Sequence, residues 1–297
     1  MVFTVFTPAY NRKDLLLKLY ESIKQQSFSD FEWLIVDDGS TDGTKEAFEK
    51  ISTESQINVR YFFKSNGGKH TAINYGVKLA NGQLFTIVDS DDSLLPESLE
   101  ILNREWLDVK DDQTVCGITG LSAYYDNQII GSKFPSVNKD VNFADAYLKY
   151  GVTGDKLVSF KTDILRNYSF PEKEGINFVF EAVVWHDMAK KYKMRCVNEI
   201  LQYVNYQVEG NSDSSYKQWY VKGLAFSYFQ LIVKNIHPLN KYPKVFIWNY
   251  IYLVSNALLS HENYFKQLNS IKQKLFYILV FPRAYWSYKK MKNKMIA

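Results

Sequence analysis

Three carboxylates within four residues form the segment of this sequence that is richest in chemistry. The apolar run of residues 84–88 ends in Asp89, Ser90, Asp91 and Asp92. Carboxylates this close repel one another unless a cation or hydrogen-bond donors compensate their charge. Hard divalent cations such as Mg2+ and Mn2+ take oxygen ligands and often keep a diphosphate as co-ligand. The segment therefore favours metal-assisted binding of a diphosphate. The plain alternative is a solvated acidic turn that begins the next helix.

A second polar turn, residues 37–44, follows the apolar run of residues 31–36 and reads Asp-Asp-Gly-Ser-Thr-Asp-Gly-Thr. A carboxylate at the end of a strand can accept hydrogen bonds from a base N–H or from ribose hydroxyls. The alternative is an ordinary acidic turn in which Thr41 or Asp42 caps the next helix.

Residues 66–70, Asn-Gly-Gly-Lys-His, form a glycine-rich turn. Glycines allow backbone N–H groups and a helix N-terminus to face a phosphate, and Lys69 adds a positive charge. On its own this turn is weak evidence, because many turns between a strand and a helix contain two glycines.

The hydrophobic pattern predicts a scaffold that brings these turns together. Strand-like runs alternate with helically spaced apolar residues through residue 110. The expected strands are residues 2–7, 31–36, 59–63 and 84–88, and the expected helices are residues 12–26, 41–51, 69–80 and one opened by Pro96. This order predicts a parallel sheet with helices on both faces. Ligands bind beyond the carboxyl ends of such strands, which is where the three turns lie.

The remainder of the chain mixes element types. We expect strands at residues 115–125, 128–134 and 194–206, helices at residues 143–149 and 181–192, and only helices from residue 216 onward.

Charge is divided unevenly along the chain. Residues 214–297 contain 13 of the 36 lysines and arginines but a single acid, Glu262, and 19 aromatic residues. This region can form a nucleic-acid surface, an anionic membrane surface or a packed helical layer with solvated lysines. Nucleic acid is the least favoured of the three, because no recognised nucleic-acid-binding fold accompanies the basic residues.

Composition excludes several classes of protein. The chain has 297 residues, of which 46% are hydrophobic, as in globular proteins with a sizeable core. Two cysteines without metal-ligand spacing exclude a disulfide scaffold and argue against structural zinc. No signal peptide pattern occurs, and no apolar run reaches the ~18–20 residues of a membrane span. We therefore expect a cytoplasmic protein with at most a peripheral membrane contact.

Four segments taken together resemble the family 2 glycosyltransferases of the GT-A fold: residues 7–12 (Thr-Pro-Ala-Tyr-Asn-Arg), 36–44, 66–69 and 89–92. The resemblance is strong over residues 2–110 and looser to about residue 210. It implies an α/β protein with a Rossmann-like, mainly parallel sheet flanked by helices. The tail carries nothing specific to the family, and its helical pattern adds a C-terminal helical extension. Residues 1–212 would form the GT-A domain (nucleotide-binding half 1–110, acceptor half 111–212), and residues 213–297 the basic aromatic helical region.

The resemblance also implies roles for individual residues. Nucleotide contacts are implied for Thr7, Pro8, Tyr10, Asp38, Gly68, Lys69, Asp89 and Ser90. Asp89 and Asp91 match the Asp-x-Asp motif that holds Mn2+ or Mg2+. Substrate contacts are implied for Asp92, Asp155 and Lys156.

The family inverts the anomeric centre, and one carboxylate at the start of a late helix removes the acceptor proton. Glu181 is the candidate for this catalytic base. Ala182 follows it where an aspartate is commoner, which leaves Asp187 as a competitor. A helix-start acid favoured by the helix dipole is the plain alternative for Glu181. His186 fits a structural histidine better than a metal ligand.

The activity implied is metal-dependent transfer of a sugar from a nucleotide-sugar, with a UDP-sugar expected, to a hydroxyl of a glycan or polyprenyl-linked acceptor in surface polysaccharide synthesis. One alternative is a polyprenyl-phosphate sugar synthase. Another is an inactive GT-A module that acts as a membrane-associated partner of another enzyme. The tail, residues 214–297, would meet an anionic membrane surface or only pack on the domain.

Overall fold

The structure is a computed structural model that describes residues 1–135, 139–205 and 217–296. It divides into two compact units. The first contains Met1–Ser169 and Lys191–Gln207, and the second contains Phe170–Lys190 and Val208–Ala297. The segment Phe170–Lys190 thus groups with the C-terminal helices, whereas the predicted division at residue 212 assigns it to the first domain.

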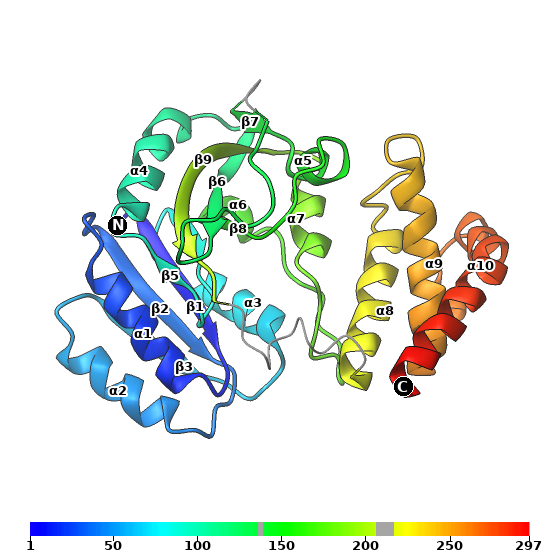
Figure 1. Cartoon of the computed structure of the whole chain (residues 1–297), viewed down its shortest axis with the longest axis horizontal. Helices are drawn as coiled ribbons and strands as arrows, with labels where there is room; N and C mark the ends of the chain where they lie inside the picture. Colours follow the sequence, from blue (N-terminus) through cyan, green and yellow to red (C-terminus); the bar gives the residue numbers. More distant parts are fainter. Residues whose placement is uncertain (136–138, 206–216, 297) are drawn as a thin grey trace. The chain divides into compact units, whose positions relative to one another are not determined.

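The first unit is built on one mixed sheet with the strand order β3-β2-β1-β4-β8-β6-β9-β5, and β7 pairs with β9. Its first half alternates strand and helix as predicted (Figure 1): β1 (Phe3–Ala9), α1 (Lys13–Lys24), β2 (Phe31–Asp37), α2 (Thr44–Glu54), β3 (Val59–Phe63), α3 (Lys69–Leu79), β4 (Leu84–Ile87), the short β5 (Ser93–Leu94) and α4 (Ser98–Val109). Strands β3, β2, β1 and β4 are parallel, so their carboxyl ends share one edge of the sheet.

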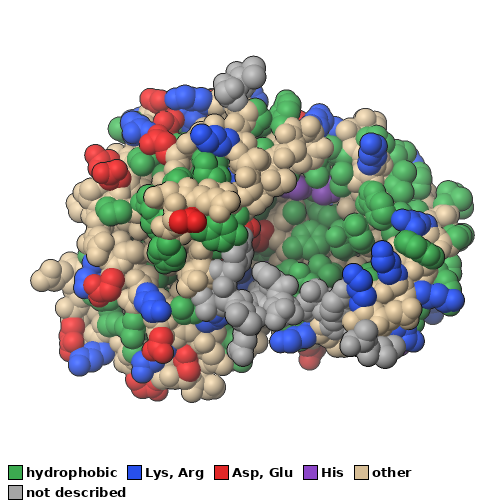
Figure 2. Space-filling model, in the orientation of Figure 1, with side chains coloured by type: hydrophobic (Ala, Val, Ile, Leu, Met, Phe, Trp, Pro, Cys, Tyr) green, Lys and Arg blue, Asp and Glu red, His purple; other side chains and the backbone are tan. Residues whose placement is uncertain are grey.

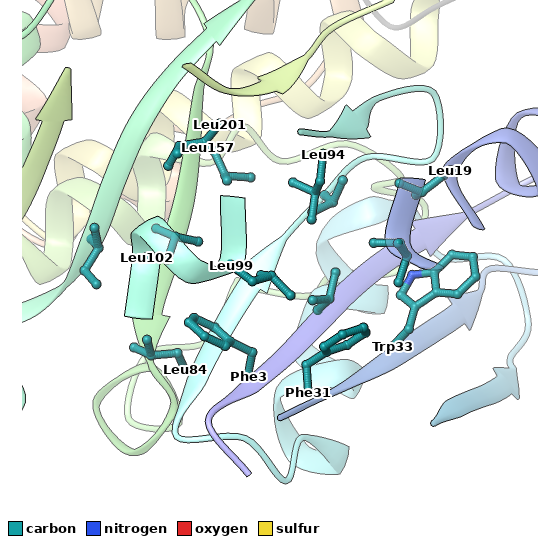
Figure 3. Close-up of a cluster of buried hydrophobic side chains, with 14 of the residues drawn as sticks. Phe3, Leu19, Phe31, Trp33, Leu84, Leu94, Leu99, Leu102, Leu157 and Leu201 are labelled. Atoms are coloured by element: carbon teal, nitrogen blue, oxygen red, sulfur yellow. The ribbon is translucent and has the colours of Figure 1, made fainter. Parts of the chain in front are cut away.

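Alternating side chains of these strands build a core on each face of the sheet. On one face α1, α2 and α4 cover the strands, and Figure 3 shows part of this cluster: Phe3, Leu19, Phe31, Trp33, Leu84, Leu94, Leu99, Leu102, Leu157 and Leu201. On the other face, α3 packs so closely on β1 that a Cβ at Gly76 would lie 2.2 Å from the Phe6 ring. Only glycine fits at this contact.

The second half of the sheet adds β6 (Val115–Ala123), β7 (Asp140–Val141), α5 (Phe143–Leu148), β8 (Lys156–Lys161), α6 (Thr162–Leu165) and β9 (Lys193–Tyr203). Strand β8 runs antiparallel to β4, with Val158 opposite Ile87. Because of this register, the start of β8 lies beside the segment that follows β4.

The predicted strand at residues 128–134 is wrong. Only a single bridge forms there, between Ile129 and Ala123. Asn127 and Gly131 adopt φ values of 65° and 75°, which turn the chain out of the extended conformation on both sides of the bridge.

The second unit is helical: α7 (Ala182–Met188), α8 (Gln218–Val233), α9 (Pro243–Ser260), a 3-10 turn (Phe265–Gln267) and α10 (Ile271–Ile296). Helix α9 packs against both α8 and α10. Its buried side, with Tyr250, Leu253 and Val254, forms the centre of this unit. The prediction of an all-helical tail is confirmed. None of the described helices has the length and apolar character needed to cross a membrane.

Candidate functional site

The two consecutive aspartates at the end of β2, Asp37 and Asp38, make different contacts. Asp37 is fully buried, and its carboxylate accepts hydrogen bonds from the Ser40 backbone N–H at 2.7 Å and from the Tyr61 hydroxyl at 2.5 Å. These bonds hold the turn that follows β2. Asp38 is directed instead towards the loop between β3 and α3.

The Asp38 carboxylate is the centre of that loop. It accepts the backbone N–H groups of Gly67 at 2.9 Å and Gly68 at 2.7 Å, and it is ion-paired with the Lys64 ammonium. Asn66 adds a side-chain bond to the Asp38 carbonyl at 2.9 Å. The predicted phosphate cradle is therefore wrong for these two N–H groups, because they bind an internal carboxylate. A nucleotide contact of Gly68 or Asp38 stays a prediction.

The loop after β1 is tied to the loop after β2. Asn11, at a φ of 50°, donates its backbone N–H to the Ser40 hydroxyl and accepts the Thr41 N–H on its side-chain oxygen, both at 2.8 Å. Among the residues predicted to line the base, Tyr10 is half exposed and Pro8 is buried in β1. Thr7 is also buried, and its hydroxyl accepts the Trp33 indole N–H at 3.0 Å.

The acidic segment after β4 lies among basic side chains. The Lys69 ammonium, at the start of α3, is 2.7 and 2.8 Å from the two carboxylate oxygens of Asp89. The Arg12 guanidinium, which follows the β1 loop, is 3.7 Å from Asp91. The structure therefore brings together the predicted residues Lys69, Asp89 and Asp91 from the ends of β3 and β4, and Arg12 joins them from the end of β1. Ser90 is buried between the two acids.

Burial and neighbouring acids raise the pKa values of Asp91 and Asp92 in this segment. For Asp91, burial and the nearby charge of Asp89 raise the pKa of the carboxyl, and Arg12 opposes this. For Asp92, burial raises the pKa most, and the charges of Asp89 and Asp91 add to it. A divalent cation would relieve this repulsion, and carboxylate oxygens are its preferred ligands, so the donor set fits Mn2+ or Mg2+. No group of three His, Cys, Asp or Glu side chains converges on one cation position among the described residues.

Lys156 is the first residue of β8 and lies beside this acidic segment, but its ammonium group points inward. Four backbone carbonyls surround the nitrogen, those of Ile130, Thr153, Gly154 and Asp155, at 2.7 to 3.3 Å. Burial lowers the pKa of Lys156 to about 8, although the charge of Asp155 opposes the shift. The lysine therefore ties two loops together. The predicted substrate contact of Lys156 stays a prediction, as does that of the exposed Asp155.

Glu181 lies in the second unit, immediately before α7. Its carboxylate accepts the indole N–H of Trp185 at 3.1 Å, and its backbone carbonyl accepts the N–H groups of Val184 and Trp185. Trp185 in turn packs edge-on against Phe170. An aromatic side chain one helical turn away thus helps to position the carboxylate.

Two residues near Glu181 in sequence, Asp187 and His186, make structural contacts. Asp187 is ion-paired with Lys190 at 2.9 Å and with Lys234 at 3.5 Å. His186 is buried, and its Nδ1 lies 2.8 Å from Nε2 of His237. Burial lowers the pKa of His186 to about 3 and that of His237 to about 4, so the pair is neutral at physiological pH. The interpretation of His186 as a structural histidine agrees with this contact.

Sequence analysis missed two basic residues of the site. Lys64 directly follows β3, and Arg12 closes the first of the four resembling segments. Polar side chains at the carboxyl ends of parallel strands converge. This rule was applied to the acids, and it would also have identified Lys64.

Comparison with known proteins gives these features a context. The family model described as Glycosyl transferase family 2 matches residues 4–161. A GalNAc(5)-diNAcBac-PP-undecaprenol beta-1,3-glucosyltransferase of Campylobacter jejuni is 28% identical over 193 residues, which cover 63% of this chain and 60% of that protein. An uncharacterized glycosyltransferase of Mycoplasma pneumoniae is 36% identical over 106 residues, covering 34% of this chain and 36% of that protein. The chain thus spans less than two thirds of the length of these relatives.

Solved structures show the same fold at low sequence identity. S. aureus TarS 1-349, in complex with UDP-GlcNAc, matches 96% of this chain and 81% of its own, with a TM-score of 0.61 and 19% identity. The mannosyltransferase PcManGT of Pyrobaculum calidifontis, in complex with GDP-Man and Mn2+, matches 99% of this chain and 83% of its own, with a TM-score of 0.56 and 19% identity. The family match extends over more than half of the chain and includes β4 and the acidic segment that follows it. The protein therefore belongs to glycosyltransferase family 2 and has the GT-A fold.

Proposed function

We propose that this protein transfers a sugar from a nucleotide-sugar, a UDP-sugar first among the candidates, to a hydroxyl of a glycan or polyprenyl-linked glycan in surface polysaccharide synthesis. The observation that carries the proposal is the convergence of Asp89 and Asp91 with Lys69 and Arg12 beyond the ends of β1, β3 and β4. Such a mixture of acids and bases suits a diphosphate bound together with a cation. We place the reaction in the cytoplasm, at the inner face of the membrane.

In the proposed reaction the acceptor oxygen attacks the anomeric carbon as the bond from that carbon to the diphosphate oxygen breaks. The electron pair leaves with the diphosphate, the acceptor proton passes to the Glu181 carboxylate, and the anomeric configuration inverts. Lys69 and Arg12 would hold the departing diphosphate. A Mn2+ or Mg2+ ion on Asp89 and Asp91 would neutralise charge on the same group. Asp38 and its loop would position the base.

Two features favour this reaction over its alternatives. A phosphate acceptor, as in a polyprenyl-phosphate sugar synthase, needs no carboxylate base, whereas Glu181 has a defined position before α7. An inactive module could lose its carboxylates without consequence, whereas Asp38, Asp89, Asp91 and Glu181 are all present.

Calorimetry with UDP, GDP and CDP, each with and without Mn2+, tests the donor site. We expect UDP to bind more tightly than GDP and CDP, and only in the presence of Mn2+. Binding of GDP instead would keep the site and change the donor. Failure of all three nucleotides to bind would contradict the proposed function and favour an inactive module.

Two buried lysines at opposite ends of β8 allow a matched test of the loops beside the acidic segment. The Lys161 ammonium contacts the carbonyls of Val109, Lys110 and Asp112 at 2.7 to 3.1 Å, opposite the start of β4. Lys156→Met and Lys161→Met each leave buried carbonyls without a donor, so each should lower the free energy of unfolding by about 1–3 kcal/mol. Only Lys156→Met should also raise the KM for the nucleotide-sugar, by about tenfold, because the loops that Lys156 holds together lie beside the acidic segment after β4.

Urea unfolding and steady-state kinetics on both variants provide the readouts. Equal KM changes in Lys156→Met and Lys161→Met would contradict the assigned role of Lys156, since they would reflect a general loss of stability.

A further inference from the structure

Helix α10 presents an apolar face that no described part of its unit covers. Ile271, Leu275, Ile278, Leu279 and Trp286 are 80%, 55%, 56%, 72% and 53% exposed. Their spacings of three, four and seven residues place them on one side of the helix, along about 22 Å of its length. We call these five residues the outer face of α10. Val280 and Ala284, on the opposite side, are buried, and this side packs towards α9.

The charges around the outer face all have one sign. From residue 263 to residue 297 the sequence contains eight lysines and arginines and no aspartate or glutamate. On α10 the exposed side chains of Lys272, Lys289 and Lys290 lie at the two ends of the outer face. A surface that covers this face must therefore be both apolar and negatively charged.

Aromatic side chains form one edge of the same surface. The guanidinium of Arg283 lies 4.3 Å from the ring centre of Trp286 and 5.8 Å from that of Trp248 on α9. Trp248 and Tyr252 are each more than a third exposed and stack on one another. Tryptophan, tyrosine and basic residues are the side chains that favour the headgroup level of a bilayer. Figure 2 shows hydrophobic side chains over these helices, with lysines and arginines among them.

We propose that the outer face of α10 docks on the surface of an anionic lipid bilayer. The aliphatic and aromatic side chains would enter the boundary between headgroups and acyl chains, and the basic side chains would contact anionic headgroups. A second copy of the chain is a poorer occupant, because its identical face would oppose basic side chains with basic side chains. Nucleic acid supplies negative charge but no apolar layer for Ile271, Leu275 and Leu279.

The proposal deepens the proposed function, since an enzyme held at the membrane would meet a polyprenyl-linked acceptor there. It does not depend on the chemistry of the donor site. Binding to vesicles and binding of nucleotide can therefore fail separately.

Sedimentation of the full chain with vesicles tests the proposal, using phosphatidylcholine alone and phosphatidylcholine mixed with phosphatidylglycerol. We expect binding to the mixed vesicles and little binding to phosphatidylcholine alone. Ile278→Ser should weaken partition into mixed vesicles by about tenfold, because it removes one exposed aliphatic side chain that would be buried on contact with the bilayer. Lys289→Gln with Lys290→Gln should weaken it by about tenfold or more and reduce its sensitivity to salt.

Leu107→Ser is the matched control. Leu107, on α4 in the first unit, has the same 56% exposure as Ile278, so its loss should leave partition unchanged. All these side chains are exposed, so the variants should keep the wild-type melting temperature and nucleotide affinity. Three results would overturn the proposal: equal binding to both kinds of vesicle, no binding to either, or a wild-type dimer that Ile278→Ser dissociates.

Discussion

Glu181→Gln should abolish nearly all sugar transfer while nucleotide binding survives. The amide keeps an oxygen that can accept the Trp185 indole N–H, so the local structure before α7 is preserved. It cannot take the acceptor proton, and the loss of a general base lowers kcat by ~10²–10⁴-fold. Single-turnover transfer from the nucleotide-sugar that calorimetry identifies, together with the Kd of its nucleotide, provides the measurement.

Asp187→Asn is the control for this experiment. Asp187 lies on α7, the helix that follows Glu181, and is ion-paired with Lys190 and Lys234. We expect a small loss of stability and a kcat close to that of the wild type. If Asp187→Asn removed transfer and Glu181→Gln did not, the catalytic base would have to be reassigned to Asp187.

Asp91→Asn should remove the Mn2+-dependent part of nucleotide binding, with an affinity loss of ~100-fold or more in the presence of the metal. The amide is a weaker cation ligand, and it also removes one of the charges that surround Asp92. Calorimetry with and without Mn2+ separates the metal-dependent part from the remainder. Asp163→Asn, at an exposed acid on α6, should bind like the wild type.

Stability without metal provides a second readout for Asp91. Burial and the charge of Asp89 raise the pKa of Asp91 in the folded state. The folded state therefore holds this proton more tightly than the unfolded chain does, and the free energy of unfolding falls as pH rises through the range in which Asp91 ionises. Asp91→Asn should thus be more stable than the wild type at neutral pH without Mn2+. Undiminished Mn2+-dependent binding with no gain in stability would argue against a metal role for Asp91.

Much of the fold could be predicted because local patterns agree with the global arrangement. The alternation of strands and helices through residue 110 predicts the parallel half of the sheet, and with it the meeting of Lys69 and Asp89, which are 20 residues apart. Such patterns do not predict which partner an individual hydrogen-bond donor will have. No spacing rule reveals that the Gly67 and Gly68 N–H groups bind Asp38.

The part of the chain after residue 110 was harder to predict, for two physical reasons. Residues 128–134 have the composition of a strand, but positive φ angles at Asn127 and Gly131 bend the chain around them. Lys156 looks like a ligand-binding lysine in sequence, because nothing local shows that four carbonyls will surround it. The grouping of α7 with the C-terminal helices depends on contacts distant in sequence, including the hydrogen bond between His186 and His237.

Strand β4 has a parallel neighbour on one side and an antiparallel neighbour on the other. Its acidic extension therefore lies between two differently connected pieces of chain. On the β1 side are the repeating strand-helix units, and on the β8 side are the loops that the Lys156 ammonium holds together. Substitutions in those loops can therefore change one side of the acidic segment while β1, β2 and β3 keep their positions on the other side.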